Sequence, residues 1–183
     1  MKIRKATTED AASVATLAER TFRSTFEADN TPKDMDEHCR KAYSAAIQGA
    51  ELSNPDIVTL VCEQPGGSLI AYAQLRSGAP KEIVGPSPIE LWRFYVDRAH
   101  HGQGVAQALM AAAIEAAEGR GAQTIWLGVW ERNPRAQAFY GKVGFVDVGA
   151  HSFVVGQDVQ TDRLMARPVG GLVGPMGPGR SGC

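Results

Sequence analysis

The chain has 183 residues, 44% of them hydrophobic, and a formal net charge of −1 from 19 basic and 20 acidic side chains. This length suits one domain with a substantial core, and the balanced charge offers no basic face for nucleic acid. No apolar run reaches the ~20 residues of a membrane span. Cys39, Cys62 and Cys183 have neither disulfide-framework nor zinc spacing, and no signal-peptide core follows Met1, so we expect a cytoplasmic protein.

The first half of the chain shows start signals for two helices, followed by a hairpin pattern. Thr31 and Pro32 form an N-cap and first-turn pair, and Pro65-Gly66-Gly67 separates two β-rich runs. The expected elements are a strand at 3–6, a helix from residue 8 to residue 23 or 25, a helix from residue 31 toward residue 49, strands at 57–63 and 68–76, and a loop at 77–88.

The second half predicts strands and helices in alternation. Apolar positions recur at three- and four-residue intervals from Val105, and Asn133-Pro134 followed by Gly144 brackets a shorter helix. The expected elements are a strand at 89–96, a helix from residue 105 to about residue 117, a strand at 124–130, a helix from residue 134 to residue 143, and strands at 145–155 and 163–167. We therefore expect one domain over residues 1–168, followed by a Gly/Pro-rich disordered tail over 169–183.

Gly102 and Gly104 lie between the strand at 89–96 and the helix that follows it. A helix N-terminus presents unpaired N–H groups and a partial positive charge, and glycines there let an anion approach closely. The pattern predicts a site for the pyrophosphate of a cofactor. The alternative is that the glycines only form a turn before the helix. A dinucleotide fingerprint is not matched, because Gln107 occupies its third glycine position.

Three segments carry a resemblance to a known family, namely 98–106, 133–140 and Gly144-Phe145. They resemble the GNAT superfamily of acetyl-CoA-dependent N-acetyltransferases. Segments 125–133, 149–153 and 160–165 look like bacterial PaiA-type spermidine/spermine N-acetyltransferases, and the likeness spans about residues 1–168. The resemblance implies an α/β GNAT fold, in which a mixed, mostly antiparallel central sheet has helices on both faces and a splayed strand pair holds CoA.

The resemblance also implies which residues bind the cosubstrate, acetyl-CoA. These are Phe94, Tyr95, Val96, His101, Gly102, Gln103, Gly104, Val105, Ala106, Asn133, Tyr140 and Lys142. His101 stands where the family pattern has Gln or Arg, so a hydrogen bond from a neutral imidazole replaces a fixed charge or an amide. We expect no metal, because His100 and His101 are adjacent, point apart and have no third ligand nearby.

Direct attack of an amine on a thioester needs a proton acceptor for the amine and a proton donor for the departing thiolate. Tyr140 is expected to be that donor, and its alternative role is to pack on the sheet with Phe139. Many relatives place a carboxylate where this chain has Trp92. The nearest carboxylate on the same face by strand alternation is Glu90, which we expect to act as base unless water relays the proton.

The sequence thus predicts an acetyl-CoA-dependent N-acetyltransferase that acts on a primary amine, with a polyamine as the first choice of acceptor. A protein lysine or N-terminal acetyltransferase and a non-catalytic CoA-binding regulatory module are the two alternatives. His151 is as compatible with a structural role as with lining the acceptor site. We expect a small-molecule partner and neither nucleic acid nor membrane binding, and the sequence leaves a homodimer open.

Overall fold

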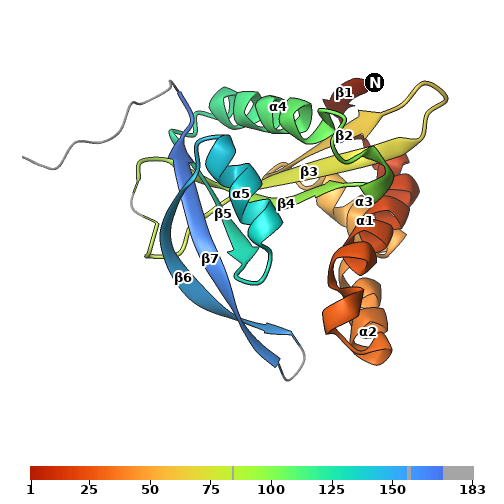
Figure 1. Ribbon diagram of the computed structural model, residues 1–183. Coiled ribbons are helices and arrows are strands. Elements are labelled where there is room, and N and C mark those ends of the chain that lie inside the picture. Colours follow the sequence, from red (N-terminus) through yellow and green to blue (C-terminus); the bar gives the residue numbers. More distant parts are fainter. Residues whose placement is uncertain (84, 156–157, 171–183) are drawn as a thin grey trace, which may run out of the picture.

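A computed structural model describes residues 1–83, 85–155 and 158–170 (Figure 1). Seven strands form one sheet in the order β1-β2-β3-β4-β5-β7-β6, and every neighbouring pair is antiparallel except β4 and β5. Successive residues Val61 and Cys62 point to opposite faces, one toward α1 and α2 and the other toward α4. The mixed, mostly antiparallel α/β fold with helices on both faces is confirmed.

The strands are β1 (Lys2–Lys5), β2 (Ile57–Glu63), β3 (Leu69–Ser77), β4 (Pro88–Val96), β5 (Thr124–Trp130), β6 (Val146–Val155) and β7 (Asp158–Pro168). The helices are α1 (Ala11–Phe26), α2 (Pro32–Ala42), α3 (Ala45–Ser53), α4 (Val105–Gly119) and α5 (Pro134–Lys142), with 3₁₀ turns η1 (Thr8–Asp10), η2 (Glu27–Asp29) and η3 (Arg98–His100).

The predicted single helix from residue 31 toward residue 49 is wrong, because the chain breaks it into α2 and α3. Tyr43 leaves the helical region and turns into the core, where it is 5% exposed. Ser44 then caps α3 by accepting a hydrogen bond from the Ile47 N–H at 3.3 Å. The buried Gln48 side chain donates to the Ala42 carbonyl at 3.0 Å, which satisfies the end of α2.

A β-bulge interrupts the alternation of β4 opposite β3. Gln74 is opposite Arg93, and the next residue, Leu75, is opposite Leu91, so Trp92 is the extra residue. As a result Arg93 lies on the α3 face, where its guanidinium donates to Glu51 at 2.5 Å. This buried ion pair ties α3 to the sheet beside the bulge, and removing one partner would leave an uncompensated charge.

The last strand is longer than predicted, whereas β6 begins one residue later than expected, at Val146. β7 begins at Asp158 instead of residue 163; its residues 158–166 pair with β6 and its residues 162–168 pair with β5. Val169 follows it and is 4% exposed, with its N–H bonded to the Gln123 carbonyl at 3.0 Å. The ordered core therefore extends one residue past the expected boundary at 168. Most of the predicted tail, residues 171–183, lies outside the described residues.

In the part of the chain that the structure describes, no helix has both the length and the apolar character needed to cross a membrane.

Candidate active site

The parallel strands β4 and β5 pair only at one end and then separate. Their register runs from Pro88 opposite Thr124 to Glu90 opposite Trp126 and stops there. From residues 91 and 127 onward, the facing edges of the two strands are no longer paired with each other. Backbone N–H and C=O groups on such edges are strong hydrogen-bonding groups that can pair with an extended ligand. The opening between the strands is therefore shaped for a strand-like molecule, and the expected splayed pair is confirmed.

The turn from β4 to α4 presents the two glycines to solvent. Gly102 and Gly104 have φ angles of 76° and 79°, a left-handed conformation that L side chains rarely adopt. A methyl group at either glycine would have open space within 4 Å, so the glycines meet a backbone requirement and leave the helix start accessible. Val105 anchors the helix in the core at 3% exposure, Gln103 is exposed, and Ala106 is half-buried. This N-terminus suits a phosphate group.

His101 bridges the end of β4 and the start of α5. Its Nε2 lies 2.9 Å from the Val96 carbonyl oxygen, and its Nδ1 lies 2.7 Å from a guanidinium nitrogen of Arg135. A carbonyl can only accept and a guanidinium can only donate, so this arrangement uses Nε2 as the donor and Nδ1 as the acceptor. Arg135, which is exposed, brings a fixed positive charge to the loop.

Sequence reasoning missed Arg135 as a site residue. The sequence places Arg135 in the first turn of the predicted helix after residue 133. Its connection to the glycine loop comes only from its contact with His101 in the folded chain.

Helix α5 starts as predicted and runs across the opening. Asn133 caps it by accepting a hydrogen bond from the Ala136 N–H at 3.1 Å, with Pro134 in the first turn. Phe139 of α5 stacks on Phe94 of β4, with ring centroids 5.8 Å apart. Lys142 is exposed in the last turn of α5, about 10 Å along the helix from Arg135 at 1.5 Å per residue, so its contact with CoA stays a prediction.

Tyr140 is held among three aromatic rings beside the opening. Its ring is 8% exposed and meets Phe94, Phe139 and Phe145 edge-on, at centroid distances of 6.2, 5.6 and 5.7 Å. Burial raises the pKa of the Tyr140 hydroxyl well above its usual value, and the neighbouring Tyr95 hydroxyl adds to the shift. The phenol is therefore protonated at neutral pH, which is the state a proton donor requires.

Tyr95 belongs to the opposite face of β4, where its ring stacks on that of Tyr72 with centroids 5.7 Å apart. Burial raises the pKa of Tyr95 to about 12, and a hydrogen bond from Tyr43 acts in the opposite direction.

Glu90 lies at the closed end of the opening, where β4 and β5 still pair. Its carboxylate is ion-paired with the Arg76 guanidinium and is 13% exposed. Arg76 in turn lies over the Trp92 ring, 4.1 Å from its centroid. Among the described residues Glu90 forms no hydrogen bond with Tyr140, and the role of Glu90 as base stays a prediction.

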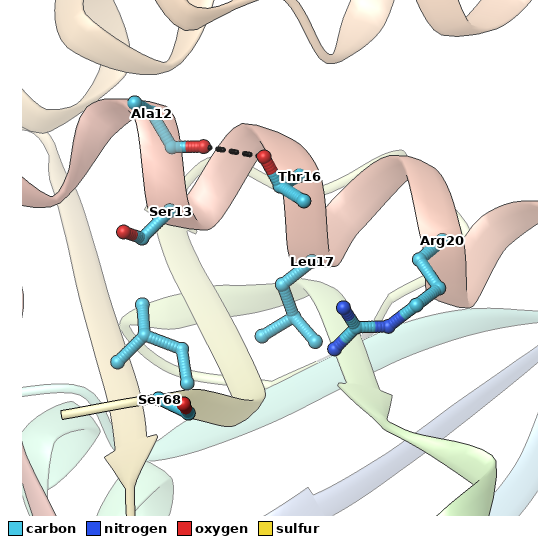
Figure 2. Close-up of a pocket in the computed structure, with 7 residues that line it drawn as sticks. Ala12, Ser13, Thr16, Leu17, Arg20 and Ser68 are labelled. Carbon is cyan, nitrogen blue, oxygen red and sulfur yellow. Dashed lines mark hydrogen bonds between the residues drawn. The ribbon is translucent and has the colours of Figure 1, made fainter. Parts of the chain in front are cut away.

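A separate hollow of about 330 Å³ lies beside α1 (Figure 2). Its lining includes Arg20, whose guanidinium forms an ion pair with Asp97 at 2.7 Å, and Thr16, whose hydroxyl donates to the Ala12 carbonyl at 2.9 Å. None of the predicted site residues lines it. No group of three or more His, Cys, Asp or Glu side chains that could hold a metal ion occurs in residues 1–83, 85–155 and 158–170.

The half-open parallel pair offers edges to an extended molecule, and the accessible start of α4 suits a phosphate group at one end of it. The family model for the acetyltransferase (GNAT) family matches residues 15–145. An uncharacterized N-acetyltransferase from Lactobacillus delbrueckii subsp. lactis is 30% identical over 168 residues, covering 91% of this chain and 96% of that protein. The chain therefore belongs to the GNAT family of acetyltransferases.

Two further similarities concern proteins with more specific names. The crystal structure of PaiA N-acetyltransferase from Thermoplasma acidophilum in complex with coenzyme A has a TM-score of 0.73 and 22% identity, covering 91% of this chain and 98% of that chain. The ribosomal protein bS18-alanine N-acetyltransferase of Haemophilus ducreyi is 42% identical over 55 residues, which are 30% of this chain and 38% of that protein.

The protein is thus an acyltransferase that uses acetyl-CoA as its cosubstrate. The residues present fit that molecule, because the loop at 101–106 leaves donors and space for phosphates and the strand edges beyond residues 90 and 126 are open to a pantetheine chain. Membership of this family favours an enzyme over the alternative of a non-catalytic CoA-binding regulatory module.

Proposed function

We propose that the protein transfers the acetyl group of acetyl-CoA to a primary amine of a polyamine such as spermidine or spermine. One observation carries the choice of acceptor. The three segments that look like PaiA-type enzymes, 125–133, 149–153 and 160–165, belong to β5, β6 and β7, which lie together on one side of the opening. The fold likeness to the Thermoplasma PaiA enzyme supports the same choice.

An aromatic wall on the acceptor side agrees with a cationic acceptor. The ring centroids of Phe26, at the end of α1, and Trp130, at the end of β5, are 5.7 Å apart. The ring of Phe22 stacks on that of His38, with centroids 4.3 Å apart. Electron-rich ring faces attract ammonium groups, so this wall favours a flexible polycation over a neutral or anionic molecule.

In the proposed reaction, acetyl-CoA supplies an activated acetyl thioester, and the chain supplies position and protons. The N–H groups at the end of β4, over residues 94–96, polarise the carbonyl that the amine attacks. Tyr140 donates a proton to the departing sulfur, because burial keeps its phenol protonated at neutral pH. Arg135 and the start of α4 bind the phosphates.

A second candidate acceptor is the N-terminal amine of a protein. The match to ribosomal protein bS18-alanine N-acetyltransferase favours it, at 42% identity over 55 residues. Such an acceptor would approach the same open strands as an extended peptide and pair with their edges.

A screen of amines for CoA release separates these candidates. Spermidine, spermine, a lysine-containing peptide and a peptide with N-terminal alanine are each incubated with acetyl-CoA and the enzyme, and free thiol is measured. Faster release with the polyamines supports the proposal. Release with a peptide alone would replace it by the second candidate, and release with none of them would contradict both.

A further inference from the structure

Asp162 and His151 form a side-chain pair on the hairpin of β6 and β7, opposite each other in the strand register. Asp162 Oδ2 lies 3.9 Å from His151 Nε2. The reaction described above gives neither residue a role. Figure 1 shows this hairpin continuing the sheet beyond β5, on the side of the opening away from α1 to α3.

Gly128 in the middle of β5 makes room for this pair. It is an exposed residue in a strand whose other members are buried or half-buried. A methyl group at position 128 would lie 3.3 Å from Asp162 Oδ2 and 3.8 Å from His151 Nε2. A glycine inside a strand marks a place where another group comes close to the backbone. Because Gly128 has no side chain, the Asp162 carboxylate and the His151 imidazole can lie close to the backbone of β5.

The pair lies next to the aromatic wall, at the end of β5 that is not paired with β4. Asp162 is the register partner of Trp130, whose ring contacts that of Phe26. An ammonium group attracted to the aromatic wall would therefore lie close to the Asp162 carboxylate.

The environment of Asp162 makes it a better proton acceptor than an ordinary aspartate. Its side chain is 21% exposed. Burial raises the pKa of the Asp162 carboxyl, and the nearby His151 opposes this shift. A carboxylate of raised pKa binds a cation and holds a proton more readily than a fully solvated one.

We propose that Asp162, with His151 beside it, binds the ammonium group of the acceptor and takes the proton that frees its lone pair. This proposal rests on the proposed function and deepens it. The ammonium loses one proton to Asp162, which releases it to solvent. The free amine forms the C–N bond as the C–S bond breaks, and the electron pair of that bond leaves with sulfur. Tyr140 protonates the sulfur and regains its proton from the nitrogen.

Glu90 is the competing carboxylate, and its surroundings make it less suited to the task. Its charge is already paired with Arg76, and it lies where β4 and β5 remain hydrogen-bonded to each other. A carboxylate held by a guanidinium is a weaker base than one that no guanidinium pairs.

Direct binding of spermidine by calorimetry tests the recognition step without turnover. The variants are Asp162→Asn and, as a matched control on the same hairpin, Asp147→Asn, whose exposed carboxylate pairs with Arg163. We expect Asp162→Asn to weaken spermidine binding at least tenfold and Asp147→Asn to leave it within about twofold of wild type. Equal affinities in all three proteins, or no binding to wild type, would overturn the proposal.

Turnover of amines that differ in basicity tests the proton step. Spermidine is almost fully protonated at neutral pH, whereas trifluoroethylamine is mostly neutral and needs no base before attack. We expect Asp162→Asn to lower kcat with spermidine by about 100-fold and to lower kcat with trifluoroethylamine far less. Equal losses with both amines would overturn the role of Asp162 as proton acceptor.

Unchanged CoA binding in Asp162→Asn is the control for its fold. His151→Gln should raise KM for spermidine less than Asp162→Asn does, because His151 acts through Asp162. The outcome is separable from that of the proposed function. A wild-type enzyme that acetylates only peptides contradicts the polyamine assignment in the CoA-release screen, whatever Asp162 does.

Discussion

A guanidinium nitrogen of Arg135 lies 2.7 Å from Nδ1 of His101, and this contact joins the first turn of α5 to the glycine loop of α4. The two residues together provide what Gln or Arg provides at position 101 in the family pattern. The imidazole orients, and the guanidinium carries the charge.

Arg135→Gln should therefore weaken CoA binding by about fivefold, the scale of a solvent-exposed ion pair of up to ~1 kcal/mol. Arg120→Gln, at the far end of α4, removes the same charge from a residue that bonds the Pro55 carbonyl and should leave CoA binding unchanged. Calorimetry with CoA and with pantetheine, which lacks the phosphates, decides the matter. Equal loss with both ligands would mean that Arg135 does not act on phosphate.

Gly104→Val should lower CoA affinity by more than about tenfold, equivalent to ~1.4 kcal/mol, by closing the approach to the start of α4. Gly121 is the matched control, because its φ of 75° and open surroundings are alike but it lies after the end of α4. Both valine variants should lose about 1–2 kcal/mol of stability from left-handed backbone strain. Loss of CoA affinity in Gly121→Val as well would attribute the effect to strain alone.

Tyr140→Phe deletes one hydroxyl and keeps the ring packing with Phe94 and Phe145. We expect turnover to fall roughly 10²–10⁴-fold while CoA affinity and melting temperature change little. Tyr72→Phe removes a buried hydroxyl that makes no hydrogen bond within residues 1–83, 85–155 and 158–170, and it should leave turnover intact. Near-normal turnover in Tyr140→Phe would contradict the assignment of Tyr140 as proton donor.

Glu90→Gln should reduce turnover less than Tyr140→Phe does, because the Glu90 carboxylate is already engaged by Arg76. Initial rates at saturating acetyl-CoA measure the difference. A loss as large as that of Tyr140→Phe would identify Glu90 as the base and exclude Asp162 from that role.

The ion pair of Arg4 and Asp10 makes one contribution to the pH dependence of stability. Hydrogen bonds from Arg4 at 2.8 Å lower the pKa of Asp10 from 3.8 to about 2. This stabilisation is complete above pH 4 and is lost as the pH falls through about 2. Asp10→Asn should reduce the free energy of unfolding by about 1–2 kcal/mol at pH 7, with the difference shrinking toward pH 2. Urea titrations, with the exposed Glu9→Gln as control, measure it.

The local parts of the fold were predictable from sequence, because their signals lie within a few residues. The start of α5 at Asn133-Pro134 and the bounds of β5 are confirmed, as is the start of α4 after Gly104. The break between α2 and α3 was missed because Ser44 and Tyr43 interrupt a helical pattern only once Tyr43 has a core to enter.

The candidate site was only partly predictable, since its remaining members meet through long-range register. Asp162 reaches Gly128 and His151 through the pairing of β7 with β5 and with β6, and no spacing in the sequence encodes that meeting. The bulge that turns Arg93 toward α3 is likewise a property of the β3–β4 pair. Alternation within one strand therefore identified Glu90 but not Asp162.

Three register pairs connect β4 to β5, so the backbone hydrogen bonds between the two sides of the sheet form only a short seam. One half contains β1 to β4 and the other contains β5 to β7, and the chain links them through α4 and the loop before β5. A molecule that pairs with both facing edges adds hydrogen bonds where the two strands have none with each other, and because it binds the folded chain, it also stabilises that chain against unfolding.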